Sequence, residues 1–409
     1  MRIYLDHNAT TPLRPAAREA MVAVLDGVFG NPSSTHADGA AARRVVEDAR
    51  EQVASLVGAA PREVTFTAGA TEANNTVLAS LRDGSLPWRR LVTTRAEHPS
   101  VREPALALAR AGLDVAWLDV DRDGRLDLAQ LDAALAAGPP ALVSVIAANN
   151  ETGVVAPIDA IAERVRAAGA FLHTDVTQAL GKIPVRALAA GAHWLSASAH
   201  KLGGPKGTGC LVAREGLGLP ALLQGGPQER RARGGTENVA GIAGFGAACA
   251  EAERALPERA LRDAALRDRL WSGLRARLER IAWNGAPDGD GRAPAAHALL
   301  PNTLSLEIEG AAADVLLEAL DLEGIAVSTG AACHSGAIEP SHVLLAMGRS
   351  PERARSTLRL SVGEGNDEAQ IDRAIATIAA LAARARAALG GELGAAPGGA
   401  RARAAGARA

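Results

Sequence analysis

Short apolar runs alternate with helical patterns through the first half of the chain. The apolar runs have the length of β-strands, and the patterns between them repeat with the period of an α-helix. Strands and helices in alternation predict an α/β fold, in which a mostly parallel sheet is covered by helices on both faces. The predicted strands span residues 64–67, 91–94, 115–118, 142–147, 171–174 and 194–196, and the predicted helices between them span 100–111, 128–137 and 158–168.

Further elements are predicted on both sides of this region. Residues 15–25 have helical spacing, and residues 40–57 form an amphipathic helix that Gly58 closes. The Ala/Gly/Arg-rich segment 390–409 has low complexity, and we expect it to be disordered. The later predictions are a long helix at 238–281, a surface connection at 284–294, strands at 303–308 and 357–362, and helices at 312–320 and 367–389.

Composition narrows the class of protein. Aromatic residues make up only 2% of the chain, so a core built from its 48% apolar residues must consist of Ala, Leu and Val. A formal net charge of −2 gives no electrostatic reason to expect nucleic acid or a membrane surface as a partner. There is no apolar run of 18 residues and no signal-peptide pattern, and Cys210, Cys249 and Cys333 lie far apart. We therefore expect a cytoplasmic protein without a disulfide framework or a metal site.

Lysine is rare in this chain. Lys182, Lys201 and Lys206 are the only lysines among 44 basic residues. Lysine can lose its proton and form an imine with an aldehyde, whereas arginine cannot. Lys201 follows a predicted strand and lies in the polar, glycine-rich stretch 196–209, so we interpret it as a reactive amine. Lys182 stands between a glycine and Ile-Pro, and we interpret it as a surface residue.

Polar residues follow the predicted strands, at the edge where α/β sheets bind ligands. A pyridoxal phosphate site needs an imine-forming lysine, an acid beside the pyridine nitrogen and small donors for the phosphate. Lys201 and Asp175, which lies 26 residues earlier, can meet the first two needs, although a helix N-cap role for Asp175 is equally compatible. The turn at 69–71 opens a predicted helix and offers N–H groups and a hydroxyl, to which Ser198 and His200 can add. The residues that follow predicted strands are Thr71, His98, Asn150, Asp175, Gln178 and Lys201.

These residues belong to a longer series of motifs in order along the chain. With them the chain closely resembles the cysteine desulfurases, which are fold-type I pyridoxal phosphate enzymes of the class V aminotransferase group. The resemblance runs from Tyr4 to about Leu389. The matching motifs lie at residues 4–6, 8–12, 30–34, 67–75, 97–98, 149–153, 175–178, 198–201, 235–238 and 330–333.

The resemblance implies a pyridoxal phosphate site around the positions already singled out. Lys201 matches the lysine that forms the imine, Asp175 the partner of the pyridine nitrogen, and Gln178 the partner of the ring hydroxyl. His98 matches an imidazole that stacks on the ring and serves in proton transfer. Without the family, a capping or core role would be the better interpretation of His98. The residues that match the phosphate cradle are Ala70, Thr71, Ser198 and His200.

The resemblance also implies a substrate site, a homodimer and two domains. Asn150 and Arg359 match the residues that hold the substrate carboxylate, and an arginine within a strand suits bidentate binding of a carboxylate. Thr236 matches a residue that reaches the phosphate from the other subunit. A large cofactor-binding domain is expected at 14–255. A smaller α+β domain, which carries the catalytic cysteine loop, is expected at 1–13 together with 256–389.

Cys333 determines which reaction the resemblance implies. It matches the catalytic cysteine, and its glycine-rich surroundings with a polar neighbour suit a reactive thiolate. Cys210 and Cys249 lie in apolar or Ala/Gly-rich runs, and we interpret them as inert core residues. Residues 339–344 match the subgroup whose longer, mobile cysteine loop carries sulfur to a scaffold protein.

The implied reaction converts L-cysteine to L-alanine and leaves the sulfur as a persulfide on Cys333. The sulfur would pass to an acceptor protein for iron–sulfur cluster assembly or tRNA thiolation. A selenocysteine lyase or another β-lyase of the same fold remains an alternative, and so does a sulfur carrier without desulfurase activity. The sequence departs from the family pattern at His7, Pro227, Gly234 and Ala331, and the change at Pro227 affects the loop that carries Thr236.

Overall fold

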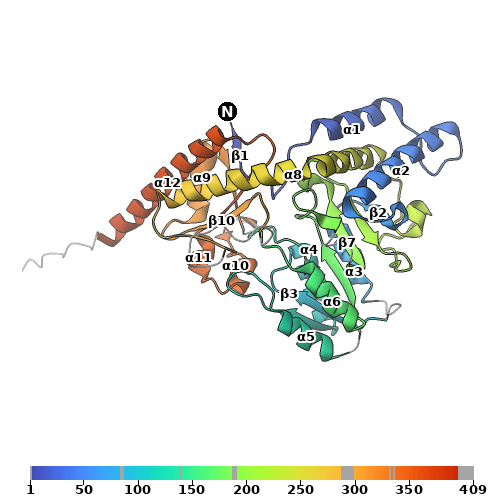
Figure 1. Ribbon diagram of the computed structural model, residues 1–409, viewed down its shortest axis with the longest axis horizontal. Helices are drawn as coiled ribbons and strands as arrows, with labels where there is room; N and C mark the ends of the chain where they lie inside the picture. The colour runs from blue at the N-terminus through green and yellow to red at the C-terminus, as the bar shows by residue number, and fades with distance from the viewer. Residues whose placement is uncertain are drawn as a thin grey trace, which may run out of the picture.

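A seven-stranded sheet forms the centre of the larger lobe of the molecule (Figure 1). The computed structural model describes residues 2–82, 87–138, 140–186, 191–286, 299–330, 333–334 and 337–394, with the backbone alone at 333–334, 337–338 and 389–394. Four of the six strand pairings are parallel, and β8 is antiparallel to both of its neighbours. The predicted mostly parallel sheet is therefore confirmed. Across the sheet the order is β2 (Val64–Thr67), β8 (Gly209–Ala213), β7 (Trp194–Ser198), β6 (Phe171–Asp175), β5 (Ala141–Ile146), β3 (Arg90–Thr94) and β4 (Asp114–Leu118).

Helices cover this sheet on both faces, as predicted. Neighbouring residues of a strand point to opposite faces, and the buried clusters follow this rule. Leu91 and Leu142 pack in a cluster with α3 and α4, whereas Val92 and Val143 pack in a second cluster with α2, α5, α6 and α8. The helices are α2 (Ala37–Val57), α3 (Ala70–Ala79), α4 (Pro99–Arg110), α5 (Leu128–Ala136), α6 (Ile158–Ala167) and α8 (Val239–Arg275).

The smaller lobe is built on a four-stranded sheet. Its neighbouring strands are antiparallel, in the order β12, β15, β10, β9. The start of the chain joins this lobe, because β1 pairs with β11 and because Ile3 and Leu5 pack in the same buried cluster as Ile371 and Ile378. The elements are β1 (Ile3–Tyr4), β9 (Ile281–Trp283), β10 (Thr303–Ile308), α9 (Ala313–Leu322), β11 (Ile325–Ala326), β12 (Ser328–Thr329), β15 (Thr357–Ser361) and α12 (Glu368–Gly394).

Helix α8 connects the two lobes. Figure 1 shows it running across the molecule from α1 and α2 to α12, and residues at its two ends belong to the buried clusters of different lobes. The predicted boundary between residues 255 and 256 lies within this unbroken helix.

The shorter elements are α1 (Pro15–Gly27), η1 (Pro61–Glu63), η2 (Ala199–Lys201), η3 (Gln228–Arg231), β13 (Cys333–His334), β14 (Ala337–Ile338), α10 (His342–Ala346) and α11 (Pro351–Arg355).

Two predicted boundaries are wrong. The helix predicted to reach residue 281 ends at Arg275, because Arg280 has a positive φ of 50° and residues 281–283 pair with β10. The last helix, α12, continues to Gly394, so residues 390–394 of the expected disordered tail are helical. The rest of that tail, 395–409, and most of the predicted connection at 284–294 lie outside the described residues.

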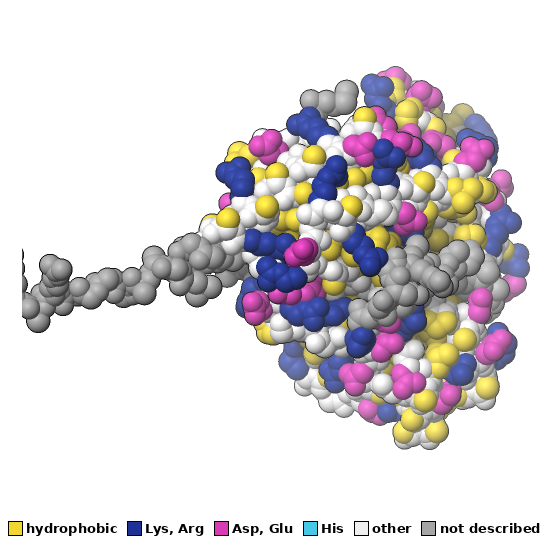
Figure 2. Space-filling model, turned by 60° about the vertical axis from the view of Figure 1, so that its left-hand side comes forward, with side chains coloured by type: hydrophobic (Ala, Val, Ile, Leu, Met, Phe, Trp, Pro, Cys, Tyr) yellow, Lys and Arg dark blue, Asp and Glu magenta, His cyan; other side chains and the backbone are white. Residues whose placement is uncertain are grey.

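The surface carries charges of both signs. In Figure 2, basic and acidic side chains are interspersed over the visible face, with small apolar groups between them. Within the described ranges, every helix is too short or too polar to cross a lipid bilayer.

Candidate active site

A cavity of about 1050 Å³ opens at the carboxyl ends of the parallel strands. Strands β6 and β7 and the loops after β3 and β5 all send residues to it, while Arg359 reaches it from the smaller lobe. Ten of the twelve predicted site residues therefore lie around a single space. They are Ala70, Thr71, His98, Asn150, Asp175, Gln178, Ser198, His200, Lys201 and Arg359.

Lys201 lies in the short helix η2 that follows β7. Its Nζ atom donates to the backbone oxygens of Asn8 and Ala9, at 2.7 and 2.8 Å. Burial, together with the charge of Arg359, lowers the pKa of Lys201 to about 8. An amine with this pKa can lose its proton near neutral pH, which imine formation and proton transfer both require.

Asp175 ends strand β6 with both carboxylate oxygens engaged. Its Oδ2 atom accepts from Asn74 at 2.8 Å, and its Oδ1 atom accepts from the backbone N–H of Thr177 at 2.9 Å. The second bond caps a turn and not a helix, because residues 177–182 form turns, so the helix N-cap interpretation of Asp175 is wrong. Asp175 also lines the cavity, where a partner of a pyridine nitrogen would have to lie.

Sequence reasoning missed the two residues that connect Asp175 to His98. Asn74 donates from the same Nδ2 group to Ser100 Oγ at 2.8 Å, and Ser100 Oγ lies 2.8 Å from His98 Nδ1. His98 also caps α4, because its Nδ1 atom accepts from the backbone N–H of Ser100. The neutral ring therefore carries its hydrogen on Nε2, and burial lowers the pKa of His98. The only sequence signal was the position of Asn74 inside the 67–75 motif.

One end of the cavity has donors suited to a phosphate. Gly69 is the N-cap of α3 and has no side chain to cover the first N–H groups of that helix. The backbone approaches closely here, since a Cβ atom on Gly209 would lie 2.6 Å from the Cα of Gly69. Ser198 and His200 line the same cavity, and burial next to Lys201 lowers the pKa of His200 to about 4, which leaves its ring neutral at pH 7.

Arg359 lines the cavity with a guanidinium that is only partly hydrogen-bonded. Its Nη2 atom pairs with Asp6 at 2.8 Å, and its Nη1 atom donates to the backbone oxygen of Asn150 at 3.2 Å. Its buried Nε atom has no hydrogen-bond partner among the described residues. A guanidinium has five N–H groups in a planar fork, so each Nη atom of Arg359 keeps a second N–H group for a carboxylate in the cavity.

The interpretation of Lys182 as a surface residue is wrong. Its side chain is buried, and Nζ donates to Gln178 Oε1 at 2.6 Å and to Asn8 Oδ1 at 2.9 Å. Asn8 itself lines the main cavity and was not singled out as a site residue. The rarity of lysine was the available signal, and it applied to Lys182 as well as to Lys201.

Of the two remaining predicted site residues, the structure places only Thr236 relative to the main cavity. Thr236 is exposed and lines a separate cavity of about 140 Å³. Cys333 lies in β13, where it pairs with Ile338 of β14, and its side chain lies outside the described part of the structure. The interpretation of the other two cysteines is confirmed, since both are buried free thiols and burial raises the pKa of Cys210 to about 12.

Both ends of the Cys333 loop are held at the carboxyl edge of the large sheet. The buried carboxylate of Glu151 accepts from Ser341 Oγ, and a Cβ atom on Gly330 would collide with it. On the same side, His342 Nε2 lies 2.9 Å from the backbone oxygen of Glu97, the residue before His98. The loop therefore begins and ends beside the residues that border the cavity.

Comparison with known families agrees with this geometry. Residues 3–374 match the family model described as aminotransferase class-V. The chain belongs to the class-V aminotransferases. Within that family it is a cysteine desulfurase, which is a pyridoxal phosphate enzyme. A cysteine desulfurase from Cereibacter sphaeroides is 42% identical over 388 residues, which cover 94% of this chain and 97% of the relative.

Solved structures support the same assignment. A NifS-like protein is 34% identical, with a TM-score of 0.85 over 94% of this chain and 100% of its own. The structure described as SspA in complex with cysteine is 29% identical, with a TM-score of 0.76 over 89% of this chain and 99% of its own. The fold-type I architecture predicted for this desulfurase is therefore confirmed.

The residues around the cavity fit the cofactor of a cysteine desulfurase. An amine of lowered pKa, an acid with fixed orientation and a helix N-terminus without a capping side chain all border one space. These are the three groups that bind an aldehyde, a pyridine nitrogen and a phosphate.

Proposed function

We propose that this cysteine desulfurase moves sulfur from L-cysteine to its own Cys333, with Lys201 as the residue that transfers protons. The observation that carries the proposal is the arrangement around the main cavity. There the amine of Lys201 has a pKa of about 8 and shares the space with the guanidinium of Arg359. An amino acid bound by its carboxylate at Arg359 would place its α-carbon within the cavity that Lys201 borders.

In this proposal three single residues hold the ring of the cofactor and a set of four residues holds its phosphate. Asp175 pairs with the pyridine nitrogen, Gln178 donates to the ring hydroxyl, and His98 stacks on the ring. When bound, pyridoxal phosphate supplies the electron sink that makes the α-proton of an amino acid removable. The phosphate is assigned to Ala70, Thr71, Ser198 and His200.

The proton steps are assigned to Lys201 and His98. Lys201 in its neutral form accepts the α-proton of the substrate at Nζ, and its lowered pKa keeps that form accessible near neutral pH. His98 is neutral and carries a hydrogen on Nε2, so it can donate a hydrogen bond to the reacting group, while the protonated Lys201 returns the proton to the product. Asn150 helps Arg359 to hold the substrate carboxylate.

The sulfur step is assigned to Cys333. Its thiolate forms a bond to the substrate sulfur while the Cβ–S bond of the substrate breaks. The electron pair of that bond stays with the carbon product, which becomes L-alanine after protonation. The ends of the Cys333 loop support this assignment, because Ser341 and His342 attach them to Glu151 and to the backbone of Glu97 at the cavity edge.

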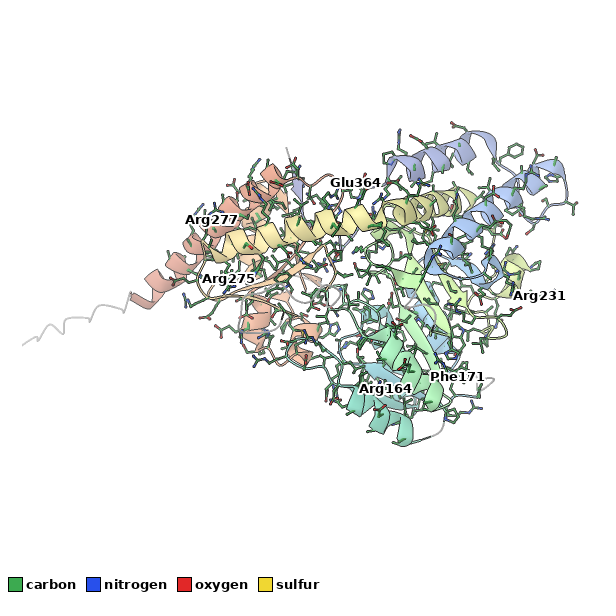
Figure 3. The ribbon with its side chains drawn as sticks, in the orientation of Figure 1. Arg164, Phe171, Arg231, Arg275, Arg277 and Glu364 are labelled. Atoms are coloured by element: carbon green, nitrogen blue, oxygen red, sulfur yellow. The ribbon has the colours of Figure 1, made fainter. Side chains whose placement is uncertain are left out.

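We also propose a homodimer in which Thr236 completes the phosphate site of the partner subunit. Thr236 is exposed and faces a different cavity of its own chain, which suits a role in another subunit. Its loop is held in an unusual shape, with positive φ at Glu229, Arg230 and Arg231. Figure 3 shows Arg231 at the periphery of the larger lobe, where a second copy could reach it. Gly234 fits this loop, since a Cβ there would lie 2.7 Å from Gly225 Cα.

The persulfide would then pass to an acceptor protein in the cytoplasm, either an iron–sulfur scaffold or a tRNA-thiolation protein. The matching motif around residues 339–344 supports such a transfer. A complex of SspA with cysteine supports L-cysteine as the molecule that fills the cavity.

The decisive experiment is incubation of the cofactor-loaded protein with L-cysteine in the absence of reductant. We expect L-alanine by chromatography and the added mass of one sulfur atom on the Cys333 peptide. Cys333→Ala should keep the visible cofactor band and lose sulfur transfer, whereas Cys249→Ala, a change in the core, should retain both. Alanine without the added mass would mean that the sulfur leaves without passing to Cys333, and pyruvate with sulfide in place of alanine would replace the proposal with β-elimination, as in a β-lyase.

A further inference from the structure

Lys182 and Lys201 contact Asn8 from two sides. Lys201 donates to the backbone oxygen of Asn8, and Lys182 donates to its side-chain oxygen. Lys182 borders a second cavity, of about 320 Å³, which shares Lys201 with the main cavity. Glu364, which lines this second cavity, lies in Figure 3 between the two lobes near α8. Two of the three lysines of the chain therefore donate hydrogen bonds to the same asparagine.

Lys182 and the backbone oxygen of Asn8 together determine which way the Gln178 amide faces. Lys182 Nζ lies 2.6 Å from Gln178 Oε1, and Gln178 Nε2 donates to the backbone oxygen of Asn8 at 2.9 Å. A lysine amine has at least two N–H groups in either protonation state, so it can donate to both oxygens. The reversed amide would place Oε1 against a carbonyl oxygen and Nε2 against another donor.

This orientation leaves one hydrogen of the amide for the main cavity. Nε2 has two N–H groups, and the Asn8 oxygen accepts only one of them. Gln178 lines the main cavity as well as this buried network. A donor is therefore available at the position where the ring hydroxyl of the cofactor is proposed to bind.

The burial of Lys182 is itself unfavourable. Its side chain is only 8% exposed, and burial together with the charge of Lys201 lowers its pKa well below the ordinary value. A buried amine must be compensated by hydrogen bonds, and here the partners are the amides of Asn8 and Gln178 rather than a carboxylate.

We propose that Lys182 is a positioning residue for the desulfurase reaction, which acts by holding the Gln178 amide with Nε2 toward the cofactor. This inference rests on the proposed contact between Gln178 and the ring hydroxyl. It goes beyond that contact because Lys182 borders the second cavity and touches the cofactor site only through its neighbours.

The test compares four variants of the full-length holoenzyme: Lys182→Met, Gln178→Met, the double variant and Lys182→Arg. The measurements are the dissociation constant of the cofactor, the wavelength of its visible band and the unfolding midpoint. We expect each single methionine variant to weaken cofactor binding about tenfold and to shift the band in the same direction. The double variant should bind the cofactor no more weakly than the weaker-binding single variant, because the two single changes remove the same contact. Lys182→Arg keeps donors and should recover most of the binding.

The outcomes separate this inference from the proposed function. If the effects of Lys182→Met and Gln178→Met add in the double variant, Lys182 acts independently and the inference is overturned. It is also overturned if Lys182→Met leaves the cofactor constant and the band unchanged. If Gln178→Met itself leaves them unchanged, the proposed role of Gln178 fails instead. Should Lys182→Met not yield folded protein, Lys182→Leu, which likewise has no donor for Gln178 Oε1, takes its place in the same cycle.

Discussion

Arg359 and Asp6 form an ion pair in which Nη2 lies 2.8 Å from Oδ1, although 353 residues separate them in the chain. The pair attaches strand β15 to the segment that follows β1, and the same segment supplies the acceptors for Lys201. Asp6 and the backbone oxygen of Asn150 each contact one Nη atom, so each of these atoms keeps a second N–H group for a carboxylate in the cavity.

Replacement of Arg359 should therefore affect substrate binding more than cofactor binding. We expect Arg359→Lys to raise the KM for L-cysteine by about 10- to 100-fold, because lysine keeps the charge but loses the planar fork. Steady-state alanine formation measures KM, and the visible cofactor band serves as the control and should not move. An unchanged KM would remove Arg359 from the proposed substrate site.

Lys201 should titrate far below an ordinary lysine. Burial disfavours its charged form and the Arg359 charge adds to the effect, so the pKa falls from 10.5 to about 8. In the cofactor-free protein, labelling of the Lys201 peptide by an amine-reactive reagent should rise with a midpoint near pH 8. Arg359→Met should move that midpoint upward, because it removes the repelling charge. A midpoint above 10 in the unmodified chain would show that the amine is not perturbed.

Glu97 should make the fold less stable as the pH rises. Burial raises its pKa from 4.5 to about 8, and Oε2 has no hydrogen-bond partner in the described part of the chain. Between pH 4.5 and about 8 the folded state therefore binds more protons than the unfolded state. The stabilisation that this protonation gives is fully present below pH 4.5 and is lost as the pH rises through about 8. The amount involved is on the order of a few kcal/mol.

Glu97→Gln tests this effect, because glutamine keeps an acceptor for Thr94 and Ile146 without a titrating group. Urea unfolding at pH 5 and pH 9 gives the free energy of unfolding of both proteins. Relative to the parent chain, the variant should gain stability at the higher pH. If the difference in free energy of unfolding between the two proteins is the same at pH 5 and pH 9, the pKa of Glu97 is not raised.

The buried pair of Arg50 and Glu229 should hold the loop that leads to Thr236. Two bonds of 2.8 and 2.9 Å join the side chains, and Glu229 also accepts from the backbone N–H of Phe66. Arg50→Met should lower the free energy of unfolding by about 3–5 kcal/mol, because it leaves the Glu229 charge buried without its partner.

The double variant Arg50→Met, Glu229→Met provides the control for that prediction. It removes both charges and should cost less than the sum of the single variants. If the loop also forms part of the dimer interface, Arg50→Met should weaken self-association in sedimentation experiments. A variant dimer as stable as that of the parent would show that the loop does not contribute to the interface.

The order of the elements was predictable because it depends on local patterns. The alternation of strands and helices, the amphipathic segment that Gly58 closes and the polar residues after the strands all follow from periods of two and 3.6 residues and from turn chemistry. Lys201 and Asp175 were predictable for the same reason, since parallel strands bring their carboxyl ends to one edge.

The tertiary structure decided what depends on contacts between distant segments. Strand β9 pairs with Leu306 and its neighbours in β10, and this pairing takes up Ile281, the last residue of the predicted helix. The start of the chain brings Asn8 to the buried amine of Lys182, although 174 residues separate the two in the sequence. The lowered pKa of Lys201 has the same origin, because burial and the approach of Arg359, 158 residues further along the chain, are properties of the assembled molecule and leave no local pattern in the sequence.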